Sequence, residues 1–198
     1  MASSMSICPI IACRVNCDFC PQELLIKEFQ SQNKLNGINF DNPNIMNFSI
    51  FKQCLDKIPK NVKITFGGYS EAFLHPECSE MILYAHNSGY KIGIFSTLVG
   101  MKLSDVDKIK HIPFSIFHIH LPDSSNIAKI AVNKKYIAVL KKLQESNITL
   151  SCMSMGNLHP KIKNILDIDL EPEDMISRGG NLENVKNDFE KKSRSFIL

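Results

Sequence analysis

Ala12-Cys13-Arg14-Val15-Asn16-Cys17-Asp18-Phe19-Cys20-Pro21 is the stretch that decides the fold. Its three cysteines lie within eight residues, in the spacing Cys-x-x-x-Cys-x-x-Cys. Thiolates this close can converge on one soft metal centre, because a loop can turn each sulfur inward. Three thiolates can hold three irons of a cubic four-iron cluster, which leaves the fourth iron open to a small molecule. An open coordination position distinguishes a reacting metal site from a closed structural one.

Two other interpretations of these cysteines stay open. A structural zinc site needs four ligands, usually in two separated pairs, and the chain has no second Cys-x-x-Cys, although Cys8 or a distant histidine could be the fourth ligand. A thioredoxin-like redox pair could use Cys17 and Cys20, but Cys13 would then have no role. Disulfide bonds are disfavoured, because the chain begins without a secretory signal.

Length and composition indicate one ordinary globular domain. The chain has 198 residues, of which 44% are hydrophobic and 22% charged, as is typical of soluble folded domains. A net charge of +3 is too small to indicate nucleic-acid binding by itself. No apolar run approaches the roughly 20 residues of a membrane span. We therefore expect a cytoplasmic protein with reduced cysteines and neither a membrane nor a nucleic-acid partner.

Strand and helix patterns alternate along the chain. Strands are predicted over residues 6–12, 62–66, 91–97, 114–121 and 148–153. Helices are predicted over residues 23–30, 49–58, 76–87, 103–109, 133–145 and 160–168. An Asn-rich segment, 33–47, is predicted to be a loop. Six strand–helix alternations predict an α/β fold with a parallel sheet, outer helices and the chemistry at the carboxyl ends of the strands.

The cysteine stretch resembles the signature of the radical S-adenosylmethionine (radical SAM) enzymes, which carry an aromatic residue just before the last cysteine, here Phe19. The resemblance implies a partial (β/α)6 TIM-like barrel. It also implies that Cys13, Cys17 and Cys20 hold one [4Fe-4S] cluster, whose open iron is chelated by the amino and carboxylate groups of S-adenosyl-L-methionine. In that family the cluster donates an electron, the sulfonium breaks, and a 5′-deoxyadenosyl radical takes a hydrogen from the substrate.

A second resemblance lies in the stretch Gly67-Gly68-Tyr69-Ser70-Glu71-Ala72-Phe73-Leu74-His75-Pro76. In radical SAM enzymes the second strand ends in Gly-Gly-Glu-Pro, often followed by an apolar pair and His/Asn-Pro. Here Tyr69-Ser70 stands between the glycines and the glutamate, and Glu71 takes the glutamate position when counted back from His75-Pro76. Glu71 is then implied to accept hydrogen bonds from the methionyl amine; a solvated loop carboxylate is the alternative. The residues of this turn implied to bind the cofactor are Gly68, Tyr69, Ser70 and Glu71.

Further cofactor contacts are implied near Phe19 and at the ends of two later strands. Phe19 is expected beside the adenine. The segment 96–100 resembles the family's Thr-Asn-Gly, so Ser96 or Thr97 could offer a hydroxyl to the cofactor, with turn capping as the alternative. His118 and His120 share one strand face by alternation and, with Pro122-Asp123, occupy the place of the family's polar contacts to ribose; a metal site is the alternative.

The segment 177–181, Ser-Arg-Gly-Gly-Asn, resembles the Ser-Arg-Ala-Gly-Asn of peptide-modifying, SPASM-tailed radical SAM enzymes. Those enzymes continue into a cysteine-rich tail, whereas this chain has no cysteine after Cys152. We expect a radical SAM domain over residues 1–185, a charged tail over 186–198 and no second cluster. The cysteines expected to pack in the core are Cys8, Cys54, Cys78 and Cys152.

Three functions stay open from the sequence. The leading hypothesis is a radical SAM enzyme that takes its electron from an external donor. The peptide-modifying resemblance favours a peptide or a partner protein as its substrate. One alternative is a non-catalytic accessory protein that binds the cluster and S-adenosyl-L-methionine. The other is a zinc-stapled binding domain.

Overall fold

The computed structural model describes residues 3–35, 45–168 and 170–173 of the chain. Within them, five strands form one sheet in the order β1-β2-β3-β4-β5, and each pair of neighbours is parallel. The strands are β1 (Ser4–Ile7), β2 (Lys63–Phe66), β3 (Ile92–Ser96), β4 (Ile116–His120) and β5 (Ser151–Met153). Helices flank this sheet, so the predicted α/β fold of the partial TIM-barrel type is confirmed. Among the described residues the sheet has five strands, without the sixth that a (β/α)6 barrel implies, although a sixth helix is present.

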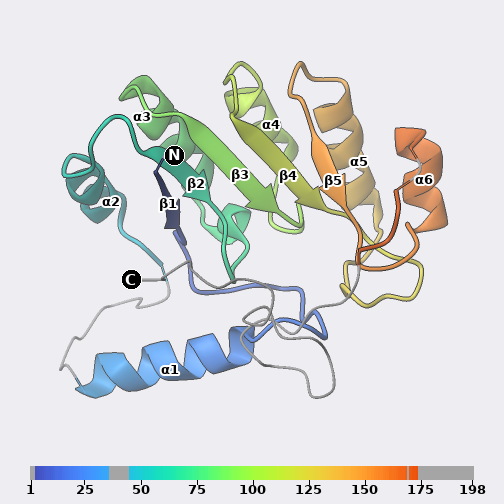
Figure 1. The fold of residues 1–198 in the computed structure, drawn as a ribbon, viewed down its shortest axis with the longest axis horizontal. Coiled ribbons are helices and arrows are strands. Elements are labelled where there is room, and N and C mark those ends of the chain that lie inside the picture. Colours follow the sequence, from blue (N-terminus) through green and yellow to red (C-terminus); the bar gives the residue numbers. More distant parts are fainter. Residues whose placement is uncertain (1–2, 36–44, 169, 174–198) are drawn as a thin grey trace.

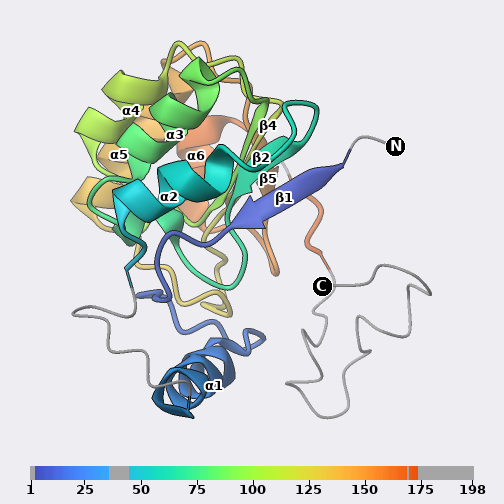
Figure 2. The same cartoon turned by 90° about the vertical axis from the view of Figure 1, so that its left-hand side faces the viewer.

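Helices connect the strands and cover one face of the sheet. They are α1 (Gln22–Leu35), α2 (Phe48–Leu55), α3 (Cys78–Asn87), α4 (Leu103–Ile109), α5 (Lys134–Gln144) and α6 (Pro160–Leu166), with a 3₁₀ turn, η1 (Ala72–Leu74). Figures 1 and 2 show α2 to α5 on one side of the sheet, while α1 lies apart, below the ends at which the strands finish. No helix among the described residues is long and apolar enough to cross a membrane.

The hydrophobic core lies between the sheet and these helices. Alternate strand residues point into it, because successive side chains of a strand face opposite sides. Phe66, Phe117 and Ile119 are fully buried there. On α3, Met81 and Ile82 meet them from the helix side and are equally buried. Burial of one such side chain contributes roughly 1.5–3 kcal/mol to the free energy of unfolding. This layer therefore holds the strands in register from the helix side of the sheet.

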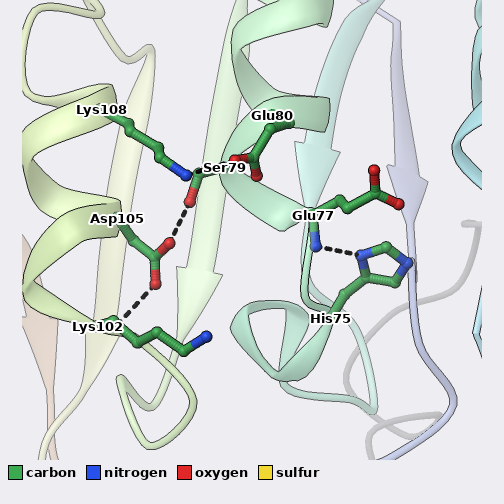
Figure 3. A network of polar contacts seen from close by, with 7 residues as sticks. All are labelled: His75, Glu77, Ser79, Glu80, Lys102, Asp105 and Lys108. Carbon is green, nitrogen blue, oxygen red and sulfur yellow. Dashed lines mark hydrogen bonds and ion pairs between the residues drawn. The ribbon is translucent and has the colours of Figure 1, made fainter.

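Polar contacts fix α3 against α4 behind the sheet (Figure 3). The hydroxyl of Ser79 donates to Asp105 Oδ1 at 2.5 Å, and Asp105 Oδ2 accepts from the backbone N–H of Lys102 at 2.7 Å. In the same view, the backbone N–H of Glu77 donates to His75 Nδ1 at 3.0 Å. One carboxylate thus caps the first turn of α4 and binds α3 at once.

The bounds of the first strand and of the second helix differ from the sequence prediction, because of a proline and a helix cap. The first strand ends at Ile7 instead of residue 12, because Pro9 has no N–H for the ladder; Ile10 makes only an isolated bridge, with Ile45. The helix predicted over residues 49–58 begins at Phe48 and ends at Leu55, and it is capped by Asn47, whose side chain accepts from the backbone N–H of Ser49 at 2.8 Å.

Two further expectations need correction. Helix α1 runs to Leu35, so it extends into the segment 33–47 that was predicted to be a loop. Cys54 is exposed on α2 and does not pack in the core, whereas Cys78 is buried as expected. Cys54 was misplaced because it stands next to Leu55, which takes the inward position of that helical turn.

Candidate functional site

A cavity of about 350 Å³ opens at the edge where the parallel strands end. Its wall comes from the cysteine loop after β1, the turn after β2, and the ends of β3, β4 and β5. All the residues that the sequence assigned to the metal or the cofactor line it: Cys13, Cys17, Cys20, Phe19, Gly68, Tyr69, Ser70, Glu71, Ser96, Thr97 and His120. The structure therefore brings the whole predicted site together, while the role of each residue stays a prediction.

The cysteine loop presents three half-buried thiols to this cavity. The backbone N–H of Cys20 donates to the carbonyl of Cys17 at 3.1 Å, which closes a tight turn between them. The thiol of Cys17 donates to the carbonyl of Ala128 at 3.1 Å. Burial, together with the charges of Glu71 and Cys20, raises the pKa of the Cys13 thiol to about 11, while backbone hydrogen bonds from Val15 and Arg14 oppose the increase. Binding of a metal here would have to displace that proton, because the thiolate is the ligand.

The three thiols of the cysteine loop are soft donors of the kind that iron–sulfur clusters use. No group of three or more His, Cys, Asp or Glu side chains in the described ranges is arranged to hold a single metal ion. A cubic cluster needs a wider arrangement, because each thiolate binds a different iron. Three soft thiols that line one cavity, on one loop, meet that need.

The loop after β4 holds the cysteine loop in place through a hydrogen bond and an ion pair to Asp18. Asp123 is 3% exposed and accepts from the backbone N–H groups of Ile127 and Ala128, at 2.8 and 2.9 Å. The carbonyl of Ile127 accepts from the N–H of Asp18 at 3.3 Å, and Lys129 forms an ion pair with Asp18. Asp123 was expected near the ribose, but its carboxylate is used to shape this loop, and it does not line the cavity in the described part of the chain.

The turn after β2 requires glycine at one position. Gly68 has φ +115°, and a Cβ atom there would lie 2.7 Å from Cys8 Sγ. The Cys8 thiol donates to the carbonyl of Gly67 at 2.9 Å and so fits against the turn. Only a residue without a side chain allows this approach.

Two contacts join the same turn to the elements around the cysteines. The side-chain amide of Gln22, at the start of α1, donates to the carbonyl of Tyr69 at 2.6 Å. The backbone N–H of Glu71 donates to the carbonyl of Ala12, next to Cys13, at 3.0 Å. The two segments that the sequence singled out are thus hydrogen-bonded to each other, although about 50 residues of chain separate them.

Glu71 lies at the centre of the site, and the alternative of a solvated loop carboxylate is wrong because its side chain is 1% exposed. Its carboxylate accepts from Ser96 Oγ at 2.8 Å, from the Thr97 N–H at 2.7 Å and from Thr97 Oγ1 at 2.6 Å. The N–H of Phe73 is a fourth donor, at 3.3 Å. Burial raises the pKa of Glu71, and the bonds from Thr97, Ser96 and Phe73 act against that increase.

The hydroxyls of Ser96 and Thr97 are therefore directed at Glu71. Ser96 Oγ also accepts from the N–H of Leu98 at 2.8 Å, and Leu98 has φ +63°. That contact is the turn capping that the sequence left open as the alternative for Ser96.

His118 and His120 share one face of β4, as predicted, while Phe117 and Ile119 are buried on the other. His118 Nδ1 lies 2.9 Å from Ser151 Oγ on β5. Burial lowers the pKa of His118, and the charge of Glu173 opposes this. The ring centroid of His120 lies 5.6 Å from that of Phe19, which brings the last strand residue of β4 against the cysteine loop.

Sequence reasoning missed three apolar residues of the wall, Val15, Phe95 and Met153. Phe95 pairs with His118, and Met153 with His120, in the register of the sheet. Alternation within each strand would have placed Phe95 and Met153 on the cavity face once that register was known. The segment 177–181, on which the peptide-modifying resemblance rests, lies outside the described residues.

No model of a protein family matches the chain, and no curated protein matches it. Solved structures that it resembles include BtrN in complex with AdoMet and 2-DOIA, at 10% identity and a TM-score of 0.45, over 87% of this chain and 78% of that one. Another is TYW1 with a lysine-pyruvate adduct bound, at 17% identity and a TM-score of 0.44, over 77% of this chain and 55% of that one. Likeness of this degree carries no argument about function.

What defines the protein is its own fold and site. It is an α/β protein with a parallel sheet of the partial TIM-barrel type and a cysteine-lined cavity at the carboxyl ends of the strands. Active sites of barrel enzymes lie at this edge.

Proposed function

We propose that the chain is a radical SAM enzyme, which holds one [4Fe-4S] cluster and cleaves S-adenosyl-L-methionine reductively. The observation that carries the proposal is the convergence of the three thiols, the turn after β2 and the ends of β3 and β4 on one cavity. Cys13, Cys17 and Cys20 would hold the cluster. When bound, the cluster supplies the electron that breaks the sulfonium and yields a 5′-deoxyadenosyl radical.

The other residues of the cavity bind and orient the cofactor in this proposal. Phe19 and His120 form a pair of rings in the wall, a surface suited to a planar base. Phe95 and Met153 make the cavity partly apolar, which helps to exclude water from a reactive species. The Gly68–Glu71 turn is held against the cysteine loop through Ala12, so cluster and cofactor ends of the site keep a fixed separation.

In this proposal an external donor supplies the electron, and a second hollow beside the cysteines supports an approach for it. This hollow, of about 360 Å³, is lined by Cys17 and Cys20 and also by Lys27 and Lys129. These two cysteines therefore line both the main cavity and this second hollow. We assign the second hollow to the electron donor and the first to S-adenosyl-L-methionine and the substrate. The candidate substrate is a peptide or a partner protein, and the proposed compartment is the cytoplasm.

A non-catalytic accessory protein that binds the cluster and S-adenosyl-L-methionine is the second candidate. The observation in its favour is the altered turn after β2. Glu71, the residue matched to the family's glutamate, already has four internal hydrogen-bond donors.

Anaerobic reconstitution with iron and sulfide tests the cluster assignment. We expect a brown protein with about four irons per chain and, after reduction with dithionite, a paramagnetic signal that changes when S-adenosyl-L-methionine is added. The spectral change tests whether the cofactor reaches the cluster. A colourless protein that retains zinc after the same treatment would contradict the proposal and favour the zinc-stapled domain.

A further inference from the structure

The Glu71 carboxylate has no acceptor capacity left for a ligand. A carboxylate offers about four lone-pair positions. One oxygen accepts from Ser96 Oγ and the Phe73 N–H, and the other from the N–H and the hydroxyl of Thr97. An ammonium group could bind there only by displacing one of these donors, which would then be left buried and unpaired.

These bonds give Glu71 a different task. Its side chain caps η1, which follows directly, through the N–H of Phe73, and joins this turn to the distant end of β3 through Ser96 and Thr97. Its own N–H binds the cysteine loop at Ala12. A side chain that is 1% exposed and tied in this way holds the shape of the wall.

The neighbouring residue, Ser70, has the opposite situation. Ser70 lines the cavity and is 8% exposed, and its Oγ is buried with no hydrogen-bond partner within the described residues. Buried hydroxyls are nearly always hydrogen-bonded, so this one calls for an explanation. Contacts on both sides fix its backbone, because Tyr69 accepts from Gln22 and Glu71 donates to Ala12. Ser70 is therefore fixed in the cavity wall, and within the described residues its hydroxyl makes no hydrogen bond.

We propose that Ser70 accepts a hydrogen bond from the amino group of S-adenosyl-L-methionine and that Glu71 is a positioning residue, which holds the turn against Ser96 and Thr97. The inference rests on the proposed function, since it names a ligand contact of the same cavity. A hydroxyl oxygen can accept from an ammonium group, and the bond would satisfy the unpaired Oγ. The inserted Tyr69-Ser70 pair would thereby supply the contact that the shifted glutamate no longer makes.

Two measurements on the same variants separate the two roles: the thermal unfolding midpoint without ligand, and the dissociation constant of S-adenosyl-L-methionine for the reconstituted protein by anaerobic calorimetry. Ser70→Ala removes a hydroxyl that the fold does not use. We expect its unfolding midpoint to stay the same or rise and its affinity to fall about tenfold. Ser154→Ala is the matched control, because Ser154 Oγ is likewise buried without a partner but Ser154 does not line the cavity in the described ranges. Its affinity should not change.

Glu71→Gln and Thr97→Val should lower the unfolding midpoint of the ligand-free protein by about 5 °C or more, because each breaks buried bonds of the wall. The double variant should lose less than the sum of the two, since both remove the same contact. This coupling between Glu71 and Thr97 would not arise if Glu71 acted on the ligand alone.

The outcomes are distinct. Ser70→Ala that binds S-adenosyl-L-methionine as tightly as the wild type overturns the ligand contact. Glu71→Gln that binds more weakly at an unchanged unfolding midpoint overturns the positioning role, because the carboxylate would then touch the ligand directly. A wild type that takes up its cluster but binds no S-adenosyl-L-methionine sinks the proposed function, and the Ser70 contact with it. The unfolding midpoints would then still decide the role of Glu71.

Discussion

Two walls of the cavity differ in how they use their polar groups. In the wall made by the turn after β2 and the end of β3, four donors satisfy the buried Glu71 carboxylate, while Ser70 Oγ has no partner within the described residues. The opposite wall, the cysteine loop, presents half-buried thiols and is fastened from behind by the loop after β4. In the first wall the Glu71 carboxylate holds the shape of the cavity. The cysteine wall offers thiols that can bind a metal.

This difference follows from where each wall sits in the fold. Ser96 ends β3, whose Ile92 and Ile94 on the same face are buried in the core, so its geometry is set by the sheet. The cysteines follow β1, which ends early at Ile7, and they lie in a loop that can turn its side chains toward a ligand. Changes in the cysteine loop should therefore affect the bound metal, and changes to Gly68 or Glu71 in the opposite wall should affect folding.

The largest effect is expected on the cysteine wall. Cys13→Ala, Cys17→Ala or Cys20→Ala should each remove most of the bound iron after anaerobic reconstitution, because each thiolate holds a different iron and the loss of one exposes the cluster. Cys54→Ala is the matched control, since Cys54 is exposed on α2 and should leave the iron content unchanged. Equal iron loss in both groups would sink the assignment of the ligands.

On the opposite wall, Gly68→Ala should cost about 3 kcal/mol of unfolding free energy in denaturant titration. The alanine would have to adopt the backbone angle φ +115°, and its Cβ atom would lie 2.7 Å from Cys8 Sγ. Gly89→Ala is the control for the dihedral strain alone, because Gly89 has φ +89° with nothing within 4 Å of the new atom. Adding Cys8→Ala to Gly68→Ala should recover part of the loss. No recovery would mean that the sulfur does not limit this turn.

A smaller effect should come from Asp123, which shapes the loop after β4 that holds the cysteine loop in place. Asp123→Asn turns one of the two acceptors for the N–H groups of Ile127 and Ala128 into a donor. We expect a loss of about 2 kcal/mol in denaturant titration. In the metal-free protein, Cys17 should also react faster with iodoacetamide, because its thiol contacts the carbonyl of Ala128. An alkylation rate at Cys17 equal to that of the wild type would show that the loop does not hold the cysteine.

Much of the fold was readable from the sequence. Strand and helix periodicity placed the five described strands, and α4 was predicted with the bounds it has, Leu103–Ile109. The three cysteines could be grouped because they are close in the chain. The pairing of Phe95 with His118 could not be read, since register depends on contacts across the sheet. Nor could the bond of Glu71 to Thr97, 26 residues away, because a loop carboxylate has the same pattern whether it is solvated or buried.

The central claim is that this cavity breaks S-adenosyl-L-methionine. The most direct test is chromatography of the reconstituted protein after incubation with S-adenosyl-L-methionine and dithionite. The account predicts slow formation of 5′-deoxyadenosine and methionine even without substrate, and none above background from Cys17→Ala. A brown protein that binds S-adenosyl-L-methionine yet yields no 5′-deoxyadenosine with strong reductants would contradict the account and favour the accessory protein.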